Sequence, residues 1–139
     1  MPYDLYGHWK EQKKRGFVYV LLFPSGECYV GYTTQTCEER WNNGKAYLYA
    51  SNKRMRQAIS RYSWNSVQKF VYHIENERHG WFAESLLINA LRSVEKGLNV
   101  SAGHYPKAVN KTSARKFIER YPGINDLYRS VKFWQEITV

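Results

Sequence analysis

Two phenols, a guanidinium, a carboxylate and a carboxamide occur in order along this chain and could together hydrolyse a phosphodiester bond. They are Tyr19, Tyr29, Arg40, Glu84 and Asn99. Such hydrolysis needs a group that takes a proton from water and a positive charge that stabilises the phosphate oxygens. Arginine suits the phosphate because it stays protonated and donates in a fork. The set fits a single-metal phosphodiesterase site, whereas any one member alone is more simply a packing or surface residue.

Glu84 is the most specific member of the set. It shares one face of an expected helix with Trp81, Leu87, Ile88 and Leu91, at helical spacing. A carboxylate on an apolar stripe is costly to bury unless it is paired or bound to a metal. Mg²⁺, or Mn²⁺ in its place, would offset that cost as a hard cation with oxygen ligands. The alternative is a carboxylate at the rim of the stripe that pairs with an arginine or a tyrosine.

The two tyrosines fall on an expected β-hairpin. The run from Phe17 to Phe23 is rich in β-branched and aromatic residues, Pro24-Ser25-Gly26 has turn chemistry, and Glu27 to Tyr32 returns. Strand alternation can present both hydroxyls to one cleft. A phenol titrates near pH ~10, so it needs nearby positive charge to act as a base, which Arg40, a lysine and the metal would supply.

Helices are expected to hold the other members of the set. Thr36 and Glu39 fit a capping box, which places Arg40 in the first or second turn of a helix. Ser51 or Asn52 caps a basic amphipathic helix that runs to Tyr62.

A third strand and three more helices follow. Val67 to Ile74 is the expected strand, and Gly80 precedes a helix of about fourteen residues that Gly97 ends. Two further helices follow Gly103. Thr112 or Ser113 caps the first, which ends at Tyr121-Pro122-Gly123, and the second runs from about Asn125 to Ile137.

The charge of the chain favours a polyanionic partner. With 139 residues, the size of one domain, it has 21 Lys plus Arg against 12 Asp plus Glu, a net charge of +9. The aromatic content of 17% suits stacking on bases or a protein contact equally well. The candidate DNA-binding residues are Lys45, Lys53, Arg54, Arg56, Arg61, Lys107, Lys111 and Arg115.

The cysteines and the hydropathy pattern indicate a cytoplasmic protein. Cys28 and Cys37 have neither the number nor the spacing of a zinc site or a disulfide framework. The chain has no apolar run of a membrane-spanning length and no apolar signal core near its start. We therefore expect no membrane partner.

The ordered set resembles the signature of the GIY-YIG nuclease family, in particular its phage and homing-endonuclease-like members. The resemblance covers about residues 16 to 104. The segments that carry it are Phe17-Val18-Tyr19, Tyr29-Val30-Gly31, the run from Gly31 to Trp41 with Arg40, the run from Ala58 to Asn65, Glu84 with Leu87 and Ile88, and Gly97-Leu98-Asn99.

The resemblance implies a small α/β fold, with a three-stranded antiparallel sheet flanked by helices. It implies metal-dependent cleavage of double-stranded DNA, with Tyr19 and Tyr29 activating water, Arg40 on the phosphate, Glu84 on Mg²⁺ or Mn²⁺, and Asn99 organising the site. We expect a basic arm over residues 1–15, a nuclease domain over 16–104 and a basic helical extension over 105–139, which either binds substrate or packs on the core. A homodimer or another protein partner is compatible with this organisation.

Two positions depart from the family pattern. Phe17 stands where the family has glycine, and Gly44 stands four residues after Arg40, where many members have a histidine or tyrosine that assists proton transfer. Lys45, Tyr47 and Tyr49 are candidates to replace that side chain. The alternative function is a catalytically impaired nucleic-acid-binding or nuclease-interfering protein that retains the fold.

Overall fold

The computed structural model describes residues 16–138, so the basic arm expected over residues 1–15 lies outside the described residues. The described chain is an α/β structure with one three-stranded sheet and five α-helices. In order, the elements are β1 (Phe17–Leu22), β2 (Cys28–Thr33), α1 (Cys37–Trp41), η2 (Asn42–Tyr47), α2 (Lys53–Arg61), η3 (Trp64–Ser66), β3 (Gln68–His73), α3 (Glu77–Leu91), η4 (Pro106–Ala108), α4 (Lys111–Arg120) and α5 (Pro122–Thr138).

The sheet is antiparallel throughout, with strand order β2-β1-β3. β1 and β2 form the expected hairpin, in which Tyr19 faces Gly31 and Leu21 faces Tyr29 across the ladder. Strand alternation therefore puts Tyr19 and Tyr29 on the same face of the sheet, as the sequence predicts. β2 is an edge strand, so half of its backbone polar groups have no partner within the sheet.

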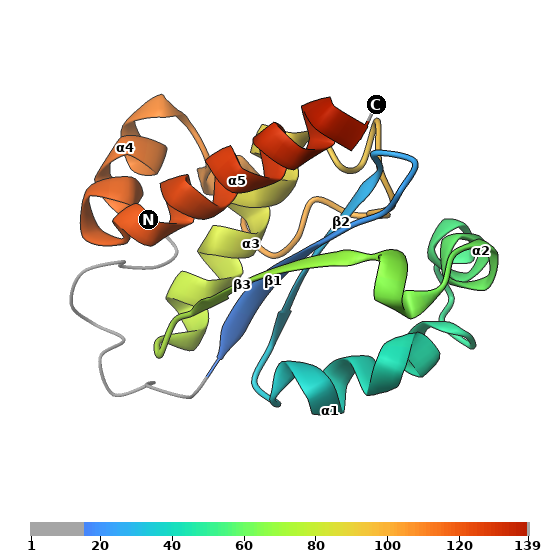
Figure 1. Cartoon of the computed structure of the whole chain (residues 1–139). Helices are drawn as coiled ribbons and strands as arrows, with labels where there is room; N and C mark the ends of the chain where they lie inside the picture. The colour runs from blue at the N-terminus through green and yellow to red at the C-terminus, as the bar shows by residue number, and fades with distance from the viewer. Residues whose placement is uncertain (1–15, 139) are drawn as a thin grey trace.

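Each face of the sheet packs a separate hydrophobic cluster, as Figure 1 shows by the helices on either side. On one face, Val18, Val20 and Val30 pack with residues of α3, α4 and α5. On the other face, Tyr19 and Leu21 pack with residues of α1, η2 and α2. The helical segment after residue 105 thus contributes to the core, through Phe117, Ile124, Leu127 and Val131.

Side-chain caps set the starts of the first two helices. The Thr36 side chain accepts from the Glu39 backbone N–H and Glu39 returns the interaction, which confirms the predicted capping box. Asn52, one of two predicted caps, accepts from the Met55 N–H at the start of α2.

Helix α3 begins and ends earlier than the sequence pattern indicates. Asn76 caps it, so Gly80 lies inside the helix. A Cβ on Gly80 would come within 2.1 Å of the Tyr32 ring, so this glycine lets α3 approach β2 closely. The helix ends at Leu91, where Arg92 adopts the left-handed conformation. Gly97 is needed instead where the chain passes the Cys28 carbonyl, 2.6 Å from where a Cβ would lie.

Two helices follow, as expected, and both start before the predicted positions. Asn110, rather than Thr112 or Ser113, caps α4 through the Ser113 N–H. α5 begins at Pro122, where the fixed φ of proline suits a first helical turn. Within the described residues, no helix combines the length and the hydropathy needed to cross a bilayer.

Candidate active site

The candidate site forms along the free edge of β2, where three groups bond the backbone that the sheet leaves unpaired. The Leu98 N–H donates to the Cys28 carbonyl at 2.9 Å. The Val30 N–H donates to Asn99 Oδ1, and Asn99 Nδ2 donates to the Val30 carbonyl, both at 2.9 Å. The Tyr32 backbone also bonds the Glu84 carboxylate. Asn99 and Glu84 therefore meet because both bond the same edge strand.

Helix α2 holds the segment that carries Asn99. Asn52 Nδ2 donates to the Leu98 carbonyl at 2.6 Å. The Arg54 guanidinium donates to the carbonyls of Gly97 and Asn99, both at 2.7 Å. Charge-assisted bonds to two carbonyls fix this turn firmly. Arg54, expected to contact DNA, thus has a positioning contact that sequence reasoning missed.

A second group of site residues lies on the face of the sheet that packs against α1, η2 and α2. The hydroxyls of Tyr19 and Tyr47 are 2.9 Å apart in the interior. Arg40 lies over the Tyr47 ring, with its Cζ 5.2 Å from the centroid, and the Trp41 ring meets the Tyr19 ring edge-on. A Cβ on Gly31 would lie 2.4 Å from the Tyr19 hydroxyl, so the lack of a side chain at Gly31 leaves room for the phenol to lie over β2.

Tyr29 connects the two groups. Burial raises the pKa of Tyr29, and the charges of both groups also act on it, Arg40 lowering this pKa and Glu84 raising it. Tyr29, Glu84 and Asn99 line a polar cavity of about 450 Å³ at the edge of β2. The structure therefore brings the predicted set together, with Tyr29 and Glu84 at the cavity and Tyr19 buried behind them.

Burial shifts the titration of the ionisable groups at the site. The pKa of Glu84 rises from its usual 4.5 to about 7 because burial disfavours its charge, although the Tyr32 backbone lowers it. Burial also raises the pKa of Tyr19 to about 12, and it raises those of Tyr29 and Tyr47. All three phenols are therefore neutral near pH ~7.

Glu84 is suited to a divalent cation. Its side chain is 15% exposed, and in residues 16–138 no lysine or arginine forms a salt bridge with it, while His104 Nδ1 lies 3.5 Å from its Oε1. The same residues contain no group of three His, Cys, Asp or Glu side chains that could enclose a metal. A cation at Glu84 would therefore keep open positions for water and phosphate, as Mg²⁺ commonly does.

Gly44, at the position where many members of the GIY-YIG family have a histidine or tyrosine, has no side chain to offer the site. Gly44 has φ +86, and a Cβ there would lie 2.9 Å from the Trp64 ring. Of the three candidate replacements, Lys45 and Tyr49 are exposed, Tyr49 to 93%, whereas Tyr47 bonds Tyr19. Tyr47 is thus the side chain that reaches the site from this segment.

Placing a histidine at this position is expected to destabilise the protein by about 2 kcal/mol or more and to give no gain in activity. Gly44→His combines the strain of a left-handed backbone with overlap on the Trp64 ring. Urea denaturation measures the change. Asn43→Gly is the matched control, since Asn43 is exposed and also left-handed, with φ 56, so glycine there should be neutral or stabilising. A Gly44→His protein as stable as the parent would contradict the contact.

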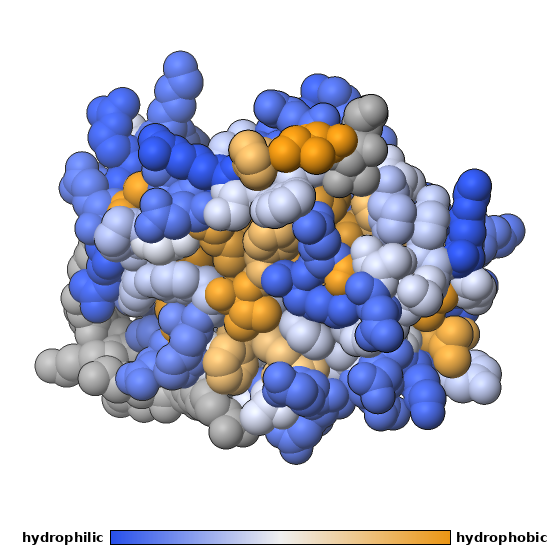
Figure 2. Space-filling view, viewed as in Figure 1, coloured by the Kyte–Doolittle hydropathy of each residue, from blue (hydrophilic) through white to orange (hydrophobic). Residues whose placement is uncertain are grey.

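The predicted DNA-binding residues separate into two groups. Lys45, Lys53 and Arg61 are exposed on η2 and α2, and Arg56 is half-buried with a bond to the Ala50 carbonyl. Lys107, Lys111 and Arg115 are exposed on η4 and α4. Figure 1 places α2 and α4 at opposite ends of the molecule, and hydrophilic residues cover most of the face in Figure 2. None of these side chains lines the polar cavity, but Asn52, which precedes Lys53, and His104, which lies shortly before Lys107, both do.

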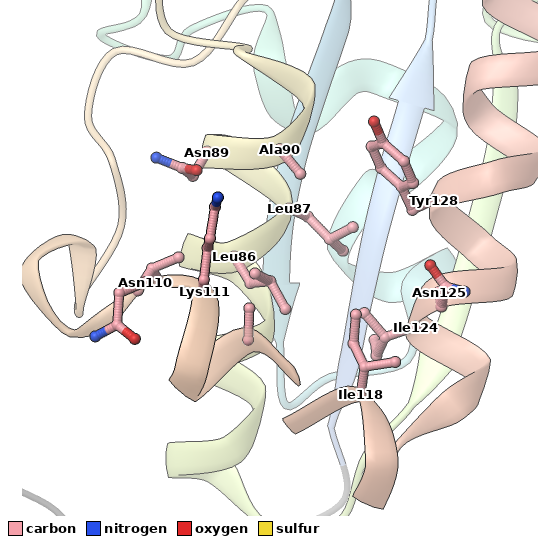
Figure 3. A pocket seen from close by; sticks show the side chains of 12 residues that line it. Leu86, Leu87, Asn89, Ala90, Asn110, Lys111, Ile118, Ile124, Asn125 and Tyr128 are labelled. Carbon is pink, nitrogen blue, oxygen red and sulfur yellow. The ribbon is translucent and has the colours of Figure 1, made fainter. Parts of the chain in front are cut away.

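A second hollow of about 480 Å³ lies among α3, α4 and α5. Figure 3 shows Leu86, Leu87, Ile118 and Ile124 pointing toward it, with Lys111 at its margin. Its lining is mainly aliphatic and contains no carboxylate that could hold a cation.

One residue at the polar cavity, His104, was not anticipated from the sequence. His104 lines the cavity beside Glu84, and its ring stacks on Trp81, which was assigned above to the helix stripe. His104 has no spacing signal, because it reaches Glu84 through an irregular loop.

No protein-family model matches this chain, and no curated protein or solved structure matches it either.

Proposed function

We propose that this chain is a metal-dependent endonuclease of the GIY-YIG type that hydrolyses phosphodiester bonds in double-stranded DNA. The observation that carries the proposal is the cavity at the edge of β2 that Tyr29, Glu84 and Asn99 line, with Arg40 near enough to lower the pKa of the Tyr29 phenol. A phosphodiesterase needs a proton-handling group between the charge that holds the phosphate and the anchor for a metal. The net charge of +9 supports a DNA substrate.

Each residue has a distinct role in the proposed reaction. Tyr29 Oη orients the attacking water and takes up its proton, with Arg40 favouring the ionised phenol. Arg40 also binds the scissile phosphate, since it is partly exposed at the end of α1. Tyr19 and Tyr47 hold one another by their hydroxyls and fix the ring beneath Arg40. Asn99 positions Tyr29 by bonding the next residue, Val30.

Glu84 holds the cation in this proposal. Mg²⁺ or Mn²⁺, when bound there, supplies the positive charge that stabilises the leaving oxygen. The raised pKa of the carboxyl means that cation binding competes with a proton near pH 7. Cleavage should therefore increase as the pH rises through this range.

The exposed cations on η2 and α2 are proposed to hold the DNA backbone beside the cavity, namely Lys45, Lys53 and Arg61. Lys111 and Arg115 would contact DNA only through a second region of the duplex, because α4 lies at the other end of the molecule (Figure 1). One site of this kind cuts one strand at a time. Double-strand cleavage would require a second copy or sequential action.

A nucleic-acid-binding protein without turnover is the second candidate. It is favoured by the burial that raises the pKa of all three phenols and so opposes their action as bases. In this case the basic surface would bind DNA or interfere with another nuclease, and the charged cavity would be retained without chemistry.

Metal-dependent nicking of supercoiled plasmid distinguishes the two candidates. The unmutated protein is expected to nick in Mg²⁺ or Mn²⁺ but not in chelator. Tyr29→Phe should reduce the rate by roughly a hundredfold or more, because it removes the proton-handling hydroxyl. Tyr62→Phe is the matched control, since Tyr62 is half-buried on the Phe23 side of the sheet and lines neither cavity.

The same assay can also contradict the endonuclease proposal or the role of Tyr29 in it. Absence of nicking on duplex and branched DNA, together with retained salt-sensitive binding, would support the second candidate. Nicking that Tyr29→Phe leaves unchanged would remove Tyr29 from the proposed reaction.

A further inference from the structure

The loop that follows Asn99 is fixed against α3. The Tyr105 N–H donates to Ser85 Oγ at 3.0 Å. Gly103 has φ +86, and a Cβ there would lie 2.6 Å from Ser85 Oγ and 3.5 Å from Glu84 Oε1. Only a glycine allows the loop to approach α3 this closely. The contacts determine where the intervening residue, His104, is placed.

His104 lies beside the Glu84 carboxylate. Its Nδ1 is 3.5 Å from Glu84 Oε1. Its ring stacks on Trp81, one turn before Glu84 on α3, with centroids 4.6 Å apart and an interplanar angle of 12°. The His104 side chain is 55% exposed, and both residues line the polar cavity. The imidazole is thus held on the open side of the carboxylate.

The distance between His104 Nδ1 and Glu84 Oε1 suits two ligand atoms that bind the same cation. At 3.5 Å, nitrogen and oxygen are too far apart for a strong hydrogen bond. Two neighbouring ligand atoms on one cation, at the usual metal–nitrogen and metal–oxygen lengths, lie about 3.0 Å apart in octahedral geometry and about 3.4 Å apart in tetrahedral geometry. Imidazole is a common metal ligand, and the stack on Trp81 limits the rotation of the ring.

We propose that His104 Nδ1 and Glu84 Oε1 ligate the same divalent cation. The inference rests on the proposed function only for the presence of a cation at Glu84. An imidazole ligand favours Mn²⁺ and the later transition metals over Mg²⁺, which prefers oxygen. The site is therefore a mixed nitrogen and oxygen site, selective for a transition metal.

Pulsed electron paramagnetic resonance on the full chain with Mn²⁺ alone tests this ligand directly. The unmutated protein should show nitrogen modulation from a bound imidazole, and His104→Phe, which keeps an aromatic ring on Trp81, should lose it. The Kd for Mn²⁺ should rise about tenfold or more, and the Kd for Mg²⁺ should change much less. His73→Ala is the matched control, because His73 is exposed on β3 and stacks on Phe17.

The outcomes separate this inference from the proposed function. Mn²⁺ binding without nitrogen modulation, or modulation that persists in His104→Phe, would overturn the ligand assignment while leaving the endonuclease proposal intact. Nitrogen modulation in a protein that does not nick DNA would support the ligand and overturn the endonuclease. Failure to bind Mn²⁺ at all would overturn the ligand assignment, and nicking in Mg²⁺ would then decide the endonuclease proposal separately.

Discussion

Glu84→Gln is expected to stabilise the fold and to abolish cleavage in the same protein. The pKa of Glu84 rises from 4.5 to about 7 on folding, because burial disfavours the carboxylate. Between these values the folded state binds more protons than the unfolded state, so stability falls as the pH rises. Above pH 7 the carboxylate is charged in both states, and burying that charge costs about 3 kcal/mol of folding free energy before the structure relaxes around it. Glutamine keeps the shape and an oxygen that can accept from the Tyr32 backbone.

The free energy of unfolding of Glu84→Gln should therefore exceed that of the unmutated protein by about 2 kcal/mol at pH 8, and the difference should be nearly absent at pH 4.5. Urea denaturation at both pH values, in chelator, measures it. Nicking should fall by roughly a thousandfold because the anchor for the cation is lost. Glu119→Gln, at an exposed position on α4, is the control and should change neither quantity. A Glu84→Gln protein that is less stable at pH 8 would show that the carboxylate is paired rather than merely buried.

Asn99→Asp should destabilise the protein by about 3 kcal/mol at pH 7 and should reduce nicking in proportion to the loss of folded site. The carboxamide of Asn99 is buried, and it both donates to and accepts from the Val30 backbone. An aspartate retains the acceptor but places a negative charge against the Val30 carbonyl. The edge of β2 would then lose the contact that fixes Tyr29 beside it.

The two substitutions should change stability in opposite directions as the pH rises. Glu84→Gln should become more stable relative to the unmutated protein, whereas Asn99→Asp should become less stable. A protonated aspartic acid can donate to the Val30 carbonyl, so the deficit should shrink as the pH falls below the raised pKa of this residue. Urea denaturation at pH 5 and pH 8 measures the change. Asn89→Asp, on the exposed side of α3, is the control. A deficit that is equal at both pH values would indicate that the Val30 bonds do not carry the effect.

Local sequence patterns predicted most of the elements because their causes are local. The hairpin of β1 and β2 follows from alternating residues and a turn, and α1 follows from the Thr36 and Glu39 capping box. Patterns failed where a glycine serves a distant contact. Gly80 and Gly97 read as helix boundaries in the sequence, yet they make room for the Tyr32 ring and the Cys28 carbonyl. A one-dimensional pattern does not distinguish the two uses of glycine.

The chemical types of the site residues and their order were determined by the sequence alone, since a carboxylate on an apolar stripe and a phenol on each strand are local facts. Their meeting was decided by the tertiary structure. The free edge of β2 needs hydrogen-bond partners, and Glu84 and Asn99 meet Tyr29 by supplying them. The roles of Tyr47, Arg54 and His104 likewise depend on contacts between distant segments, namely with Tyr19, with the turn before Asn99 and with Glu84. Such contacts arise from packing, which no spacing along the chain records.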